Sequence, residues 1–90
     1  MTDVRDNPSL NRFELDLGGE TAVALYRRQG DTLLVHHTET PVAMRGQGIG
    51  GRLVQGMLEI ARERGEKVAP RCGFVRRFMD EHPEYADLRA

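Results

Sequence analysis

The sequence is short of cysteine and of long apolar runs. Of its 90 residues one is a cysteine, Cys72, so no disulfide can form within the chain, as suits a reducing compartment. No apolar run approaches the roughly 20 residues of a membrane-spanning helix, and residues 1–12 contain no hydrophobic signal core. We therefore expect a cytoplasmic protein with no membrane partner.

An excess of charge is also missing. The chain has 13 Lys and Arg against 14 Asp and Glu, a formal net charge of −1. Proteins that bind nucleic acid usually carry a clear basic excess, so we expect no nucleic-acid partner. A chain of this length buries only about 60% of its unfolded surface, so the core is modest. We expect a monomer or a weak homodimer.

The first half of the chain has the apolar alternation of β-strands. Phe13, Leu15 and Leu17 alternate with acidic residues, a period of two that is typical of a half-buried strand. Gly18-Gly19 and residues 29–31 provide turn signals, so the strands should form an antiparallel meander. The predicted strands are residues 12–17, 20–28 and 32–39.

The pattern becomes helical after Pro41. Apolar residues recur at helical spacing from about 48 to 64, and Gly65 is placed to end that helix. A strand at 66–70 and a helix at 74–82 follow. The strands on either side of the first helix should be parallel, because a helical crossover joins them. The helical spacing of the second helix assigns four residues to the core: Phe74, Val75, Phe78 and Met79.

These elements predict one α/β domain over residues 12–90, a mixed sheet with two helices. Residues 1–11 are polar and contain Asn7-Pro8-Ser9, so we expect a flexible N-terminus.

A glycine-rich stretch separates the third strand from the first helix. Gly46-Gln47-Gly48-Ile49-Gly50-Gly51 satisfies G-x-G-x-x-G. A dinucleotide-binding fold needs the first glycine directly after a strand, within a repeating βαβ series, and neither condition holds. No Gly-Lys-Ser/Thr follows, which excludes a Walker A loop.

Glycine is a poor start for a helix unless something approaches the backbone closely. The first N–H groups of a helix and its dipole together favour an anion such as a diphosphate, and a side chain at these glycines would block it. Arg45 could add its guanidinium. The alternative is a loop that serves packing alone, but such a helix usually starts with Ser, Thr or Asp.

Arg45-x-x-Gly48-x-Gly50 resembles Q/R-x-x-G-x-G/A, the acyl-coenzyme A pyrophosphate motif of the GNAT superfamily of N-acetyltransferases. Residues 36–85 also resemble a compact branch of that superfamily, with "P-x-C-x-F/Y-V" and "H/N-P-x-Y/W" after the helix. The resemblance implies a minimal GNAT-like fold, a meander followed by β-α-β-α. It also implies acetyl-CoA or coenzyme A as cofactor, an amine as acceptor, and no metal.

In GNAT enzymes the pantetheine arm of the coenzyme enters between two splayed parallel strands and pairs with the main chain before the motif. The resemblance places that main chain at residues 38–42, where an N–H group would hold the oxyanion. The implied cofactor-binding residues are Thr38, Thr40, Val42, Arg45, Gly46, Gln47, Gly48, Ile49, Gly50 and Gly51.

Three residues are candidates for catalysis. His37 and Glu39 are two apart on one strand and so share a sheet face, where either could be the base; a solvated or structural side chain is the alternative. Cys72 lies between the last strand and the last helix, where a helix N-terminus lowers the pKa of a thiol. It could accept the acetyl group, act as an acid or form a mixed disulfide with coenzyme A; otherwise it is a small buried residue.

Two functions follow. The first is an N-acetyltransferase that passes an acetyl group to an unidentified amine, directly or through Cys72. The second is a non-catalytic module that binds or senses coenzyme A, since the chain lacks the helices from which larger GNAT members build much of their acceptor site.

Overall fold

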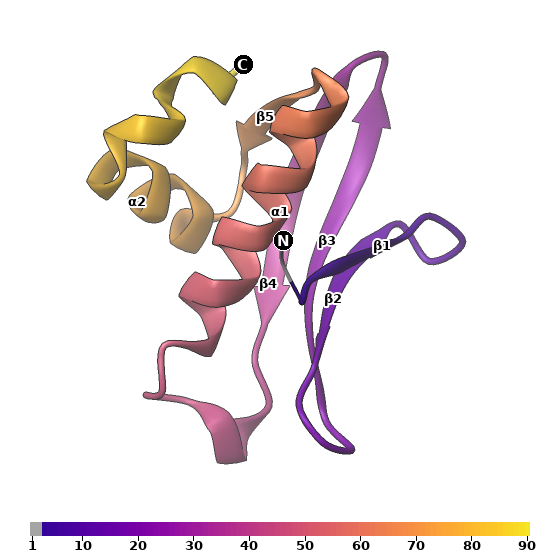
Figure 1. Ribbon diagram of the computed structural model, residues 1–90, viewed down its shortest axis with the longest axis vertical. Coiled ribbons are helices and arrows are strands. Elements are labelled where there is room, and N and C mark those ends of the chain that lie inside the picture. Colours follow the sequence, from indigo (N-terminus) through magenta and orange to yellow (C-terminus); the bar gives the residue numbers. More distant parts are fainter. Residues whose placement is uncertain (1–2) are drawn as a thin grey trace.

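The computed structural model describes residues 3–90 and shows one five-stranded sheet whose strands follow the order of the sequence (Figure 1). The first three pairs of neighbours are antiparallel, and β4 and β5 are parallel, as predicted. The α/β fold class is therefore confirmed. The strands are β1 (Arg5–Asn7), β2 (Arg12–Asp16), β3 (Thr21–Gln29), β4 (Thr32–Glu39) and β5 (Lys67–Pro70); the α-helices are α1 (Ile49–Arg64) and α2 (Gly73–Glu81).

Helix α1 connects β4 to β5 in the sequence and packs along one face of the sheet (Figure 1). Glycines bound it at both ends: Gly48 is the N-cap and Gly65 the C-cap, with φ of 73° and 69°. Both conformations are left-handed, which glycine adopts without the steric cost that other residues incur. Among the described residues, no helix combines the length and hydropathy needed to span a membrane.

The core lies between α1 and the sheet. Phe13 and Leu15 of β2, and Leu33 and Val35 of β4, are fully or almost fully buried, as expected for alternate residues of strands with one face on a helix. The apolar stripe of α1 completes the layer with Leu53, Val54, Met57, Leu58 and Ala61.

Helix α2 contributes less to the core than the sequence predicts. Val75 and Met79 are buried, and Phe78 is partly buried against the same cluster. The assignment of Phe74 to the core is wrong, because its side chain is 45% exposed. Helical spacing identified the inward stripe, but Phe74 lies in the first turn of α2, at the edge of that stripe.

The N-terminal segment also differs from the prediction. Within residues 1–11, which we expected to be flexible, Arg5–Asn7 forms β1 and pairs with β2, and Val4 is buried. Residues 1 and 2 of that segment lie outside the described residues. A strand of three residues is too short to show a period, so it could not be predicted from the pattern of apolar residues. Two 3-10 helices, Val42–Met44 and Pro83–Leu88, were likewise not predicted.

The pairing of β4 is irregular on both of its edges. Leu25 pairs with His37 while Tyr26 pairs with Val35, so His36 is an extra residue that bulges from β4. On the other side, the pairing with β5 ends at Val35 and Pro70. The last part of β4, residues 36–39, therefore continues without β5 beside it, and the sheet opens there.

A layer of charged side chains attaches β1 to β2. The Glu14 carboxylate accepts hydrogen bonds from Arg5 Nη2 at 2.6 Å, from Arg12 Nε at 2.6 Å and from Asn7 Nδ2 at 3.2 Å. Arg5 also pairs with Asp16. The Glu14 side chain is only 4% exposed, and all three donors lie on β1 or β2.

We predict that the free energy of unfolding changes less with pH in Glu14→Gln than in the wild type. The pKa of Glu14 lies below its ordinary value, chiefly because Arg12 donates a hydrogen bond to the carboxylate. Burial opposes this shift, and the hydrogen bond from Asn7 adds to it. A lowered pKa stabilises the fold above the pKa of the unfolded chain, and this contribution is lost as the pH falls through the folded value. Urea unfolding should show the variant about 1 kcal/mol less stable at pH 7, with the gap closing toward pH 3. A constant gap would contradict the assignment.

Candidate functional site

A cavity of about 580 Å³ lies where β4 ends and α1 begins. Its volume is in the range of small-molecule sites in proteins. Three segments that the sequence separates form it: the end of β4, the loop into α1, and the start of α2. The lining residues are His37, Thr38, Glu39, Thr40, Met44, Arg45, Gly46, Gly48, Ile49, Gly50, Gly51 and Phe74.

The start of α1 presents backbone N–H groups to this cavity. The first hydrogen bond between helix residues runs from Arg52 N to Gly48 O at 3.1 Å, so the amides of Ile49, Gly50 and Gly51 have no carbonyl partner in the helix. No side chain caps the helix, and its first turn holds no acidic residue. The positive end of the helix dipole is therefore free to bind an anion.

The structure gives a conformational reason for two loop glycines. Gly46 and Gly48 have φ of 83° and 73°, in the left-handed region, and a Cβ on either would meet no atom within 4 Å. Their own backbone, and not a neighbouring side chain, thus requires glycine.

The predicted coenzyme residues fall into two groups. All but two line the cavity, Arg45 among them, whose Nε donates to Thr40 O at 3.3 Å. The exceptions are Val42, which is 77% exposed, and Gln47, which is also exposed and does not line the cavity.

His37 and Glu39 both line the cavity, and the structure brings them together. His37 Nε2 lies 3.5 Å from Glu39 Oε2, and the side chains are 53% and 65% exposed. Solvent can therefore reach both, so a proton taken at the cavity could pass to bulk water. His36, the bulged residue, is exposed and does not line the cavity.

Cys72 lies beside the cavity without lining it. It is the N-cap residue of α2, and its Sγ lies 3.6 Å from the Thr38 hydroxyl, which does line the cavity. Burial alone would raise the pKa of the Cys72 thiol, but the backbone of Val75, the Thr38 hydroxyl and the backbone of Phe74 bring the net pKa below its ordinary value. The sulfur makes no capping hydrogen bond, so these helix amides act on it mainly as dipoles.

Sequence reasoning missed Met44 and Phe74, the two remaining lining residues. Met44 belongs to the 3-10 helix Val42–Met44, for which the sequence had no signal. Phe74 was assigned to the core by its spacing, and its position next to the glycine loop depends on how α2 packs. Neither position could be read from the order of the residues.

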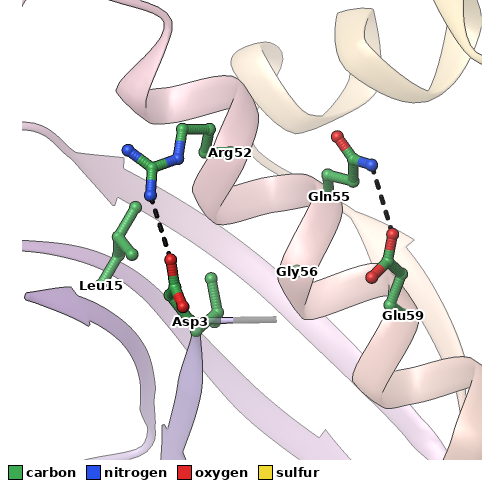
Figure 2. Close-up of a pocket in the computed structure, with 7 residues that line it drawn as sticks. Asp3, Leu15, Arg52, Gln55, Gly56 and Glu59 are labelled. Atoms are coloured by element: carbon green, nitrogen blue, oxygen red, sulfur yellow. Dashed lines mark hydrogen bonds and ion pairs between the residues drawn. The ribbon is translucent and has the colours of Figure 1, made fainter. Parts of the chain in front are cut away.

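A second cavity, of about 200 Å³, lies between α1 and the segments that carry Asp3, Val4 and Leu15. Figure 2 shows Arg52 of the helix reaching toward Asp3, near Leu15, and Gln55 and Glu59 paired with each other further along the helix. Arg52 pairs with Asp3 at 3.3 Å, and Gln55 donates to Glu59 at 3.2 Å, so its polar groups already have partners. None of the predicted site residues lines this cavity.

Comparison with known proteins agrees with this geometry. Residues 12–88 match the sequence model of a family described as GCN5-related N-acetyl-transferase. The chain is 30% identical over 89 residues to protein NATD1 of Danio rerio, a match that covers 93% of this chain and 81% of the relative. It is 32% identical to protein NATD1 of Mus musculus, over 80% of this chain and 68% of that one.

A solved structure has the same fold. An NMR structure of a GCN5-like protein from Staphylococcus aureus superposes with a TM-score of 0.70 and 22% sequence identity, over all of this chain and 91% of the other. The family match over most of the chain carries the assignment, and the fold agrees with it. The chain belongs to the GCN5-related N-acetyltransferase family.

Proposed function

We propose that this protein binds acetyl-CoA in the 580 Å³ cavity and transfers the acetyl group to an amine. The observation that carries the proposal is the start of α1. Three N–H groups without helix partners, on residues 49–51, border a cavity of the right size for an extended ligand. Membership of the family supports the choice of coenzyme.

The lining residues suit two parts of that coenzyme, the diphosphate and the pantetheine arm. The amides of residues 49–51 and the Arg45 guanidinium suit its diphosphate. The stretch of β4 beyond the end of the β5 pairing leaves a strand edge at residues 36–39, where an extended arm with amide groups could pair with the main chain. Met44, Ile49 and Phe74 offer apolar contacts in the same cavity.

The acetyl transfer itself needs a base and a way to stabilise negative charge. Glu39, assisted by His37 at 3.5 Å, would take the proton of the amine as its nitrogen attacks the thioester carbonyl. A main-chain N–H of residues 38–42 would stabilise the oxyanion. The C–S bond then breaks, which yields the amide and the coenzyme thiolate. We favour this direct route, because Glu39 and His37 line the cavity and Cys72 does not.

A route through Cys72 keeps one supporting observation, its lowered pKa. The Cys72 thiolate would attack the thioester carbonyl and release the coenzyme thiolate. The amine would then attack the new thioester, form the amide and regenerate the Cys72 thiolate, with its proton passing to Glu39.

A second function, binding of coenzyme A without turnover, is favoured by one feature of the fold. In the described residues the strands β1 to β4 follow one another with no helix between them, where larger members of the superfamily carry helices that shape the acceptor site. Steady-state assays over a broad amine panel separate the two functions, since only the enzyme would show turnover above background.

We predict that charge at Gly48 controls coenzyme affinity. Gly48→Asp should weaken binding of coenzyme A at least about tenfold by calorimetry, because a carboxylate at the helix start repels the diphosphate. Gly48→Asn keeps the shape without the charge and should lose much less. Gly65→Asp is the matched control, since its φ is within a few degrees of that of Gly48 and its Cβ also meets open space. Equal losses at both positions would refute the proposed diphosphate site.

Removing the base should lower turnover and leave binding intact. We expect Glu39→Gln to reduce kcat about 100-fold with little change in coenzyme affinity, as for loss of a general base. Cys72→Ala should retain activity if transfer is direct. Mass spectrometry after incubation with acetyl-CoA reports the other route, because an acetyl group on Cys72 that amine discharges would show that the thiol carries it.

We predict that the Thr38 hydroxyl helps to lower the pKa of Cys72. Thr38→Val removes a hydroxyl that favours the thiolate, so the pKa of Cys72 should rise. The rate of alkylation by iodoacetamide against pH should then have its midpoint at higher pH than in the wild type. Cys72 is the single cysteine of the chain, so the profile reports one site. An unchanged midpoint would exclude the Thr38 contact as a cause.

A further inference from the structure

Phe74 occupies an unusual place for a large apolar side chain. Leu10, Val42 and Phe74 are the large apolar residues that the described part of the chain exposes, and of these Phe74 alone lines the 580 Å³ cavity. It lies in the first turn of α2, two residues after Cys72, and extends toward the first turn of α1.

The ring is seated directly on Gly50. A Cβ built on Gly50 would lie 2.8 Å from Phe74 Cζ, closer than carbon atoms pack, and 3.2 Å from Cε2, a tight contact. Gly50 lies inside α1, and its φ is not in the left-handed region, so its backbone does not require glycine. A side chain at this position would therefore have to displace the ring. Gly51 differs, since its Cβ would lie 3.7 Å from Phe78 Cε2, an ordinary contact.

We propose that Phe74 is a positioning residue of the coenzyme pocket and that Gly50, which has no side chain, leaves room for its ring. The ring joins the first turn of α1, which presents the amides, to the first turn of α2, which carries Cys72 at its N-cap. It thereby sets the width of the cavity between them, and its exposed face provides an apolar wall. This inference rests on the proposed function, because it takes coenzyme A as the ligand.

The chemistry of the wall indicates which part of the ligand meets it. Phe74, Met44 and Ile49 are the apolar side chains among the lining residues, whereas the amides of residues 49–51 suit the phosphates. The methyl and methylene groups of the pantetheine arm are the apolar groups next to the diphosphate. Phe74 therefore favours ligands that carry the pantetheine arm. The affinity of ligands without that arm should not depend on Phe74.

The contact with Gly50 is tested by a double-mutant cycle on thermal stability, without any ligand. Gly50→Ala should lower the melting temperature in the wild type, where the new methyl displaces the ring, and should not lower it in a Phe74→Ala background. Gly51→Ala is the matched control and should behave alike in both backgrounds, because its Cβ meets Phe78. Additive effects of Gly50→Ala and Phe74→Ala would overturn the seating.

The role of the ring is tested by binding of two probes, coenzyme A and adenosine 3′,5′-bisphosphate, which lacks the arm and the second phosphate of the diphosphate. Phe74→Ala should weaken coenzyme A about tenfold, the loss of one aromatic wall, and leave the bisphosphate unchanged. Phe74→Met keeps a large apolar side chain and should weaken coenzyme A binding less than Phe74→Ala. Equal weakening of both probes, or of neither, would overturn the positioning role.

The same measurements separate this inference from the proposed function. If the wild type binds neither probe, the coenzyme site itself is wrong, and the wall falls with it. If the wild type binds coenzyme A and Phe74→Ala binds it equally well, the coenzyme site stands and only the role of Phe74 is refuted.

Discussion

The candidate coenzyme site depends on one backbone carbonyl, at which the pairing of the parallel strands β4 and β5 ends. Val35 O accepts hydrogen bonds from both Arg71 N, at 2.9 Å, and Cys72 N, at 3.0 Å, so the chain leaves β5 and turns into α2 at that point. β4 continues for another four residues, with His36 bulged from its ladder to β3. The opening in the sheet, the free strand edge and the place of Cys72 all follow from this divergence.

The parts of the structure that the sequence could predict are those with a long period or a demanding backbone. The strands β2 to β5 and both α-helices lie within about one residue of their predicted bounds, and all but β5 have apolar patterns that extend over five residues or more. The loop glycines identified the start of α1, since a left-handed N-cap such as Gly48 leaves a clear trace in composition.

The remaining parts depend on contacts between distant segments. β1 pairs with β2, and the Arg5 and Asn7 side chains donate hydrogen bonds to the Glu14 carboxylate, contacts that have no local signature in the sequence. Phe74 was assigned to the core because its spacing fits a helix stripe, yet the packing of α2 against α1 brings the ring to Gly50. The position of a residue along its helix or strand could thus be predicted from the sequence, whereas its contact with a distant segment of the chain could not.

The charged layer around Glu14 has a consequence for local motion. β1 spans three residues at one edge of the sheet, where Arg5 forms ion pairs with Glu14 and Asp16, whereas the cavity lies between β4 and α1, three strands along. Ionic strength screens such pairs but hardly affects buried apolar contacts. Hydrogen exchange at the β1 amides should therefore accelerate with added salt while the central strands stay protected, so that the two margins of the sheet open independently.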